Sequence, residues 1–210
     1  MHSDTGAFDR NTFINCPFDA EYRPLLRALL FTVLDCGLEP RIALEKPDSG
    51  QVRVAKILSL IEASRFSIHD ISRLEPLSAG DLPRLNMAFE LGLDLGCRTF
   101  GPAELSRKQC LILEREPYRY QRVLSDLSGN DIRAHSGDPH QLIREVRNWV
   151  KVATGRRIHA AALISQRFAE FQSDLMSVLT RLGFSPDEIQ SLEVVEFIEY
   201  AQEWIQDRPT

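Results

Sequence analysis

Three polar side chains recur every four residues along segment 86–94, whose sequence is Asn-Met-Ala-Phe-Glu-Leu-Gly-Leu-Asp. In a helix this spacing places Asn86, Glu90 and Asp94 on one face, beside a stripe that begins with Met87 and Leu91. A carboxylate among the apolar side chains of Met87, Phe89 and Leu91 is not an ordinary solvated charge, so Glu90 is a candidate functional residue. The structural alternative is a half-exposed Glu90 that pairs with an arginine.

Polar residues also follow the predicted strands, where open parallel α/β sheets bind their ligands. Together with Asn86, they give the candidate substrate-binding residues: Asn15, Asp19, Asp48, Arg53 and Asp70. Three have a plainer interpretation, because Asp48 lies in a sequence typical of a turn, Arg53 suits a solvated helix start and Asp70 can cap a loop. Cys16 has no histidine near it in the sequence, which disfavours a thiolate nucleophile.

The elements that must position these residues alternate along the chain. Short β-prone runs lie near residues 12–15, 41–44, 66–71, 108–113 and 132–135. Segments with helical periodicity lie near residues 25–37, 54–61, 85–96 and 139–152. This alternation predicts an α/β fold, with a five-stranded, mainly parallel sheet and flanking helices.

The last part of the chain has a different pattern. Its apolar side chains recur in a 3-4-3-4 spacing that predicts a helix with a narrow apolar seam: Ala161, Ile164, Phe168, Phe171, Leu175, Val178 and Leu182. A capping box from Ser185 to Glu188 starts a second helix, which runs to about Ile205. This helical hairpin either packs on its own domain or forms a homo-oligomer. The predicted organisation has three parts: a flexible N-terminus over 1–11, an α/β domain over 12–155 and the hairpin over 156–210.

Composition narrows the classes of function. The 210 residues contain no uncharged apolar run of eighteen, and residues 1–10 lack the apolar core of a secretory signal. We therefore expect a cytoplasmic protein that does not act at a membrane. Four scattered cysteines without a Cys-x-x-Cys pair predict neither a disulfide framework nor a metal site. The net charge of −5 argues against nucleic acid as the partner.

Several short motifs resemble the TIR domain in order and spacing. They are residues 47–50 (Pro-Asp-Ser-Gly), 57–61 (Ile-Leu-Ser-Leu-Ile), 63–67 (Ala-Ser-Arg-Phe-Ser) and 89–91 (Phe-Glu-Leu). Residues 13–15 (Phe-Ile-Asn) with Asp19 resemble the first TIR strand and its exit loop. In parallel, residues 88–92 (Ala-Phe-Glu-Leu-Gly) resemble the helix of nucleoside 2-deoxyribosyltransferases, which have a related flavodoxin-like fold. The likeness covers about residues 12–152 and excludes the tail.

Both resemblances imply chemistry at an N-glycosidic bond, with Glu90 as the carboxylate next to the sugar C1. The TIR resemblance implies an enzyme that cleaves the nicotinamide–ribose bond of NAD or a related nucleotide, with NAD as substrate and no cofactor, in bacterial defence or immune signalling. One alternative is a deoxyribosyltransferase-like enzyme. The other is a catalytically silent TIR-like module that senses a nucleotide or binds a partner protein. Asn86 and Met87 stand where TIR sequences commonly have Trp-Cys, and Asn86 can hydrogen-bond a ribose hydroxyl from there.

Overall fold

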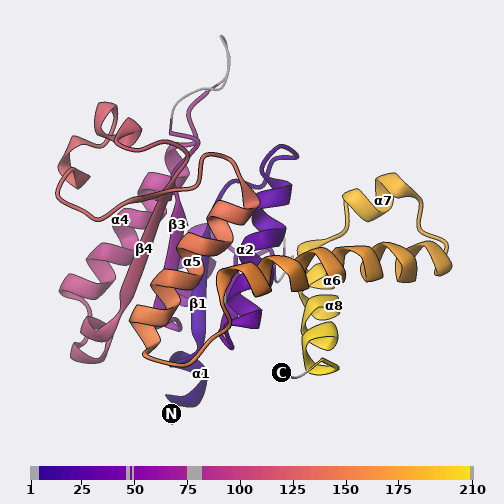
Figure 1. Cartoon of the computed structure of the whole chain (residues 1–210). Helices are drawn as coiled ribbons and strands as arrows, with labels where there is room; N and C mark the ends of the chain where they lie inside the picture. The colour runs from indigo at the N-terminus through magenta and orange to yellow at the C-terminus, as the bar shows by residue number, and fades with distance from the viewer. Residues whose placement is uncertain (1–4, 46–47, 49, 75–81, 209–210) are drawn as a thin grey trace.

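The computed structural model describes residues 5–45, 48, 50–74 and 82–208. Its centre is a parallel sheet with the strand order β2-β1-β3-β4-β5. The strands are β1 (Asn11–Asn15), β2 (Glu39–Ile42), β3 (Phe66–Asp70), β4 (Gln109–Glu114) and β5 (Arg133–Ala134). This order is that of flavodoxin-like folds, and it confirms the predicted five-stranded α/β architecture (Figure 1).

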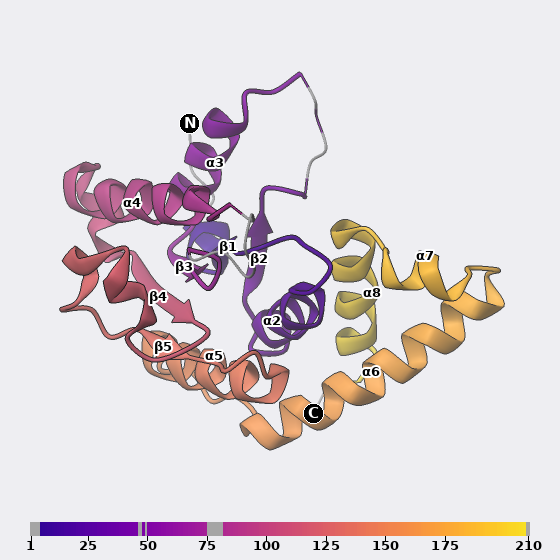
Figure 2. The ribbon, with the colours of Figure 1, turned by 90° about the horizontal axis from the view of Figure 1, so that it is seen from above.

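Helices cover both faces of the sheet (Figure 2). One face carries α2 (Arg23–Asp35) and α5 (Pro139–Thr154), and the other carries α3 (Arg53–Glu62) and α4 (Leu85–Phe100). Every residue of β1 and of β3 is buried, as expected for parallel strands covered on two sides. Because all five strands are parallel, their carboxyl ends lie at the same edge of the sheet. Side chains that follow the strands therefore meet at this edge, between the two helix layers.

Local sequence explains where the helices begin and end, and α5 shows it most clearly. The Asp138 side chain caps its start by accepting the His140 N–H at 2.9 Å, and Pro139 occupies the first helical position. Gly155 ends the helix in the left-handed conformation, with φ +67°. These signals place α5 close to its predicted bounds.

Part of the segment predicted to be a flexible N-terminus, residues 1–11, has regular secondary structure. Thr5–Phe8 form one helical turn, α1, and β1 already includes Asn11. Residues 1–4 lie outside the described part of the chain, as do residues 47 and 49 of the turn that resembles the TIR loop. Three short 3-10 helices occupy the long connections around β4: Ala103–Arg107, Arg119–Arg122 and Ser125–Leu127.

The tail packs on α2 of the same chain. It contains three helices: α6 (Ala161–Arg181), α7 (Pro186–Gln190) and α8 (Val194–Gln206). The Phe31 ring of α2 lies 5.4 Å from the rings of both Phe168 and Phe171 and 5.9 Å from Trp204. Phe168 and Phe171 are buried by these contacts. Phe168 and Phe171 are therefore not available for contact with a second chain, and a homo-oligomer formed through the tail would have to use other tail residues.

The predicted seam is correct along most of α6 and wrong at its end. Ile164, Phe171 and Leu175 are buried, but the next buried residue is Leu179, whereas Leu182 is 62% exposed. A straight helix has 3.6 residues per turn, so a 3-4-3-4 spacing drifts off a flat contact surface within a few turns. The chain follows the straight helix, and Val178 is only partly buried.

The second helix of the hairpin was predicted as continuous, which is also wrong. It is interrupted at residues 191–193. In an unbroken helix the carbonyls of Ile189 and Gln190 would accept N–H groups four residues further on. Instead they accept from the guanidinium groups of Arg27 and Arg23 on α2, at 2.6 Å each. Contacts with α2 therefore take the place of the helical bonds that would join α7 to α8.

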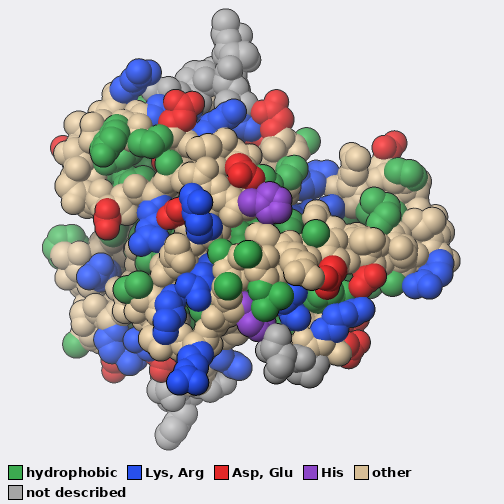
Figure 3. All heavy atoms as spheres, viewed as in Figure 1, with side chains coloured by type: hydrophobic (Ala, Val, Ile, Leu, Met, Phe, Trp, Pro, Cys, Tyr) green, Lys and Arg blue, Asp and Glu red, His purple; other side chains and the backbone are tan. Residues whose placement is uncertain are grey.

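The surface mixes both signs of charge. On the face that carries α5, Lys and Arg side chains gather over the centre and the lower part, and Asp and Glu side chains are scattered among them and toward the edges (Figure 3). Within the described ranges, no helix is at once long enough and apolar enough to span a lipid bilayer.

Candidate functional site

Glu90 lies in the second turn of α4 and is 4% exposed. Its ion-pair partner is Arg53, the first residue of α3, whose Nη2 is 3.9 Å from Glu90 Oε1. Burial raises the pKa of the Glu90 carboxyl, and the charge of Arg53 opposes this increase. The Arg53 side chain is itself 53% exposed, so water screens the attraction. Glu90 is therefore a poorly hydrated carboxylate with a weak counter-charge.

Asn15, at the end of β1, touches the same helix. It is 1% exposed, and its Nδ2 donates to the main-chain carbonyl of Met87 at 2.9 Å. The same Nδ2 lies 3.0 Å from Nδ1 of His69. Because Asn15 Nδ2 can only donate, His69 Nδ1 is the acceptor and the proton of the neutral ring lies on Nε2. The Oδ1 of Asn15 has no hydrogen-bond partner among the described residues, although it is buried.

His69 connects Asn15 to a second group on α4, the Asp94 cluster, which consists of Ser67, His69, Asp94 and Lys108. Asp94 Oδ2 accepts from Ser67 Oγ at 2.5 Å and from His69 Nε2 at 3.1 Å. Lys108 Nζ is 3.1 Å from Asp94 Oδ1. Burial alone would raise the pKa of Asp94, but His69, Lys108 and Ser67 together lower it to about 2. Asp94 is thus an ionised, paired carboxylate that fixes α4 to β3.

His69 and Asp94 of this cluster, together with Cys110, have the ligand types of a metal site. The candidate ligand atoms of His69, Asp94 and Cys110 all lie within 4.8 Å of one another. However, the ammonium of Lys108 already balances the charge of Asp94, and burial raises the pKa of the Cys110 thiol to about 12. A metal ion would have to displace that thiol proton beside a buried cation. The residues present fit a hydrogen-bonded cluster better than a metal centre.

Asp70, at the end of β3, is 0% exposed and accepts four hydrogen bonds. The donors are the Tyr22 hydroxyl at 2.5 Å, the Ser72 N–H at 2.9 Å, the Ser72 hydroxyl and His135 Nε2 at 2.9 Å. Burial alone would raise the pKa of Asp70, but His135, Ser72 and Tyr22 lower it on balance. With both oxygens used in this way, Asp70 caps the loop after β3 and joins it to α2 and β5.

The arrangement of serine, histidine and aspartate here differs from a nucleophilic triad. A triad places the serine and the aspartate on different nitrogens of the histidine. In this protein His135 Nε2 faces both the Ser72 hydroxyl, at 3.0 Å, and Asp70. Its Nδ1 accepts the Gly137 N–H, also at 3.0 Å. The group therefore holds loops together and does not activate the serine.

The remaining predicted site residues lie nearer to the surface. Asp19 accepts from Arg73 Nη2 at 2.7 Å and from the Tyr22 N–H at 3.0 Å, so it helps to start α2. Asp48 is exposed and accepts the N–H of Gly50 at 2.9 Å, which is an ordinary turn contact. Asn86 is exposed in the first turn of α4.

One buried thiol shows which of these carboxylates the fold brings together. Cys16 follows β1 and is 0% exposed. Burial raises the pKa of its thiol, and the charges of Asp70, Glu90 and Asp19 raise it further. Three carboxylates that are far apart in the sequence thus act on one thiol directly after β1. The thiol stays protonated there, so it is a poor nucleophile.

Sequence reasoning missed several residues of these clusters. Tyr22, Ser72, Lys108 and His135 were given no role, yet each makes a buried hydrogen bond or ion pair with a carboxylate. Only the positions of Ser72 and His135 next to strand ends could have drawn attention to them. The carboxylate partners of Tyr22, Lys108 and His135 lie far away in the sequence. The contact between Ser72 and Asp70 depends on a loop conformation that residue spacing does not specify.

The comparisons with known proteins add no relative from which a role could be transferred. No protein-family model, no curated protein and no solved structure matches this chain.

Proposed function

We propose that this protein is an N-glycosidase that cleaves the nicotinamide–ribose bond of NAD or a related nucleotide, with Glu90 as its catalytic carboxylate. The observation that carries the proposal is the state of Glu90, a carboxylate that is 4% exposed and has a cation no closer than 3.9 Å among the described residues. A purely structural buried carboxylate is normally paired closely, as Asp94 and Asp70 are in this protein.

The chemistry needs few groups. When the bond between ribose C1 and the nicotinamide nitrogen breaks, its electron pair moves to that nitrogen and neutral nicotinamide leaves without needing a proton. Positive charge then develops on the ribose, and a carboxylate in a low-dielectric site stabilises it strongly. Water attacks C1 and loses a proton, which gives the ribosyl product. Glu90 supplies the charge, and no metal or cofactor takes part.

In this proposal, exposed side chains near Glu90 contact the rest of the substrate. Arg53 lies beside Glu90 with its guanidinium largely in water, so it can pair with a phosphate. Asn86, one turn before Glu90, can bond a ribose hydroxyl. Asp48 lies on the exposed turn before α3. By contrast, Asn15 and Asp70 act from behind the site, through hydrogen bonds that hold α4 and the loop after β3. From the TIR resemblance we also propose that the protein forms a homo-oligomer and acts in bacterial defence or immune signalling.

The test is release of nicotinamide from NAD by the purified chain, compared with Glu90→Gln and with the matched control Glu114→Gln. Glu114 is equally buried, at 1%, but accepts hydrogen bonds from Arg119 Nη2 at 2.7 Å and from the Arg115 N–H at 2.6 Å. Glutamine keeps an acceptor oxygen for these donors. We expect Glu90→Gln to lose about a hundredfold or more in rate, and Glu114→Gln to keep its rate per folded molecule.

Three outcomes contradict the proposal. One is no nicotinamide release by the wild-type chain at any protein concentration. Another is full turnover by Glu90→Gln, which would make Glu90 structural. A third is exchange of bases between deoxynucleosides without action on NAD, which would identify the deoxyribosyltransferase-like enzyme.

A further inference from the structure

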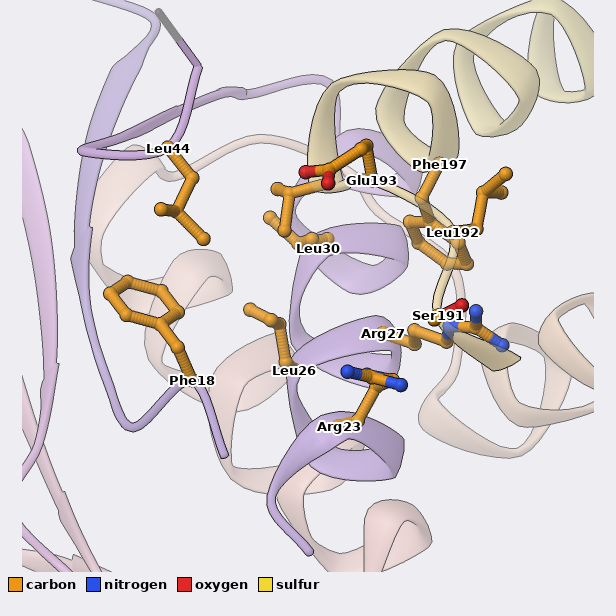
Figure 4. A pocket seen from close by; sticks show the side chains of 11 residues that line it. Phe18, Arg23, Leu26, Arg27, Leu30, Leu44, Ser191, Leu192, Glu193 and Phe197 are labelled. Atoms are coloured by element: carbon orange, nitrogen blue, oxygen red, sulfur yellow. The ribbon is translucent and has the colours of Figure 1, made fainter. Parts of the chain in front are cut away.

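A small cavity lies between α2 and the tail, away from Glu90. Its volume is about 130 Å³. The inner wall is apolar and consists of Leu26 and Leu30 of α2, Leu192 and Phe197 of the tail, and Phe18 and Leu44 from the loops after β1 and β2 (Figure 4). A wholly apolar cavity of about 150 Å³ is large enough to bind benzene, and this cavity is only slightly smaller but has polar residues at its ends. The space therefore suits one aromatic ring or a short branched alkyl group.

Two arginines stand at one end of this cavity. Arg23 and Arg27 are four residues apart on α2, so they are neighbours of like charge. Burial lowers the pKa of Arg27, and the charge of Arg23 lowers it further. Among the described residues neither guanidinium has a carboxylate within ion-pair distance. Arg23 donates to the Gln190 carbonyl and Arg27 to the carbonyls of Ile189 and Gln190, and the Arg27 guanidinium also lies over the Phe197 ring, 5.3 Å from its centroid.

This arrangement leaves the positive charge of the two arginines without a carboxylate counter-charge among the described residues. Both arginines lie in the first two turns of α2, where the helix dipole also disfavours cations, and the first turn contains no acidic residue. Each guanidinium has five N–H donors, and these hydrogen bonds engage only one terminal nitrogen of each. Donors therefore remain that can form the forked contact typical of arginine and a carboxylate.

We propose that this cavity binds a small organic monocarboxylate, with its aromatic or branched alkyl group among Leu26, Leu30 and Phe197 and its carboxylate at Arg23 and Arg27. Glu193 also lines the cavity, and its carboxylate lies at the end opposite Arg23 (Figure 4). That charge opposes a second carboxylate, so it favours monoanions over dicarboxylates. Because α2 forms one wall and the tail the other, the ligand would join the two parts of the chain.

The test is calorimetric titration of the full chain with benzoate, a monoanion whose ring matches the cavity. Benzyl alcohol and benzylamine carry the same ring without the negative charge. We expect saturable binding of benzoate at one site per chain, and at least about tenfold weaker binding of the other two compounds, since neither can form charge-assisted hydrogen bonds with the arginines through a carboxylate.

Two variants remove the two halves of the site separately. Arg23→Gln removes one charge and should weaken benzoate binding by about tenfold or more. Leu44→Phe fills the partly exposed side of the cavity while both arginines stay, and should abolish binding without lowering the melting temperature. Arg181→Gln, at an exposed arginine of α6, is the matched control and should bind as the wild type does.

The proposal fails if the wild-type chain shows no saturable binding of benzoate. It also fails if Leu44→Phe binds benzoate as tightly as the wild type, because the ligand then lies elsewhere. Equal affinity for benzoate and benzyl alcohol would overturn the role of the arginines. Arg23→Gln also removes the hydrogen bond to the Gln190 carbonyl, so a lower melting temperature of this variant would show that the tail has been destabilised. In that case the Leu44→Phe result alone decides whether benzoate binds in this cavity.

Discussion

Asn15, the last residue of β1, donates a hydrogen bond of 2.9 Å to the main-chain carbonyl of Met87, three residues before Glu90 on α4. On the other side of Glu90, Asp94 is fixed by His69 and Lys108. The helix is thus held to the sheet on both sides of the proposed catalytic carboxylate. Precise placement of a charge next to the reacting atom is what electrostatic catalysis requires.

Replacing Asn15 by alanine should therefore reduce turnover more than substrate affinity. The change leaves the Met87 carbonyl and His69 Nδ1 without their buried donor, which costs about 1–3 kcal/mol of stability. We expect kcat for nicotinamide release to fall about tenfold or more, with little change in KM. A rise in KM with unchanged kcat would instead return Asn15 to the substrate-binding role expected from its sequence position.

The Glu90→Gln variant should be at least as stable as the wild type at neutral pH. Burial raises the pKa of Glu90 in the folded state, so the charged form opposes folding at pH values above that pKa. Glutamine carries no such charge. Urea unfolding at a series of pH values should show an advantage for the variant near pH 7 that shrinks as the pH falls through the pKa of Glu90. A variant that is clearly less stable at pH 7 would show that Glu90 is needed for folding.

Removing Arg53 should shift the pH dependence of activity. The charge of Arg53 lowers the pKa of Glu90, against the larger effect of burial. Arg53→Gln should therefore raise this pKa, and the acid side of the profile of kcat/KM should move to higher pH. Arg98→Gln, at an exposed arginine in the last turn of α4, is the control and should leave the profile in place. An unchanged profile in Arg53→Gln would mean that Glu90 does not control the rate.

Lys108 and Asp94 should depend on each other for stability. Both side chains are 2% exposed, so Lys108→Met leaves a buried carboxylate without its cation, at a cost of about 3–5 kcal/mol. The double variant Lys108→Met with Asp94→Leu should lose less than the sum of the two single changes. Urea unfolding of the four proteins at pH 7 measures this coupling. Additive losses would show that the two groups do not interact.

Phe171→Ala tests whether the tail belongs to the same core as α2. The Phe171 ring is 1% exposed and stacks on Phe31 at 5.4 Å. Its loss should lower the free energy of unfolding by about 3–5 kcal/mol and leave the molecular mass seen by light scattering unchanged. If instead the variant changed its mass while keeping its melting temperature, the seam would be an interface between chains.

Much of the α/β fold was predictable because burial leaves a regular pattern in the sequence. The first strand was predicted over 12–15 from a short apolar run and is β1 (Asn11–Asn15), and the helix predicted over 85–96 from apolar periodicity is α4 (Leu85–Phe100). The second strand was placed two residues too late, since β2 is Glu39–Ile42 and includes Pro40. Proline is avoided inside sheets but tolerated at their edges, and β2 is an edge strand. Local sequence does not say which strand will be at the edge.

The clusters at the site were less predictable. Spacing along one helix identified Glu90 and Asp94, because neighbours four residues apart share a face. It did not show that Asp94 would pair with Lys108, or that His135 would meet Asp70, because those contacts depend on how separate elements pack. The same limit explains why Asp70 was expected to face a ligand, although the fold uses all of its acceptor positions for loops.

The burial of α2 has a consequence for how this protein can be divided. Apart from Arg27, every residue of α2 from Leu25 to Leu34 is buried, so the helix has no face in water. In most α/β folds such a helix is part of an outer layer, with one side in solvent. Here a recombinant fragment ending at Thr154 would expose Phe31 and its neighbours and would tend to aggregate. Expression, labelling or fusion of the α/β part should therefore keep the three tail helices attached.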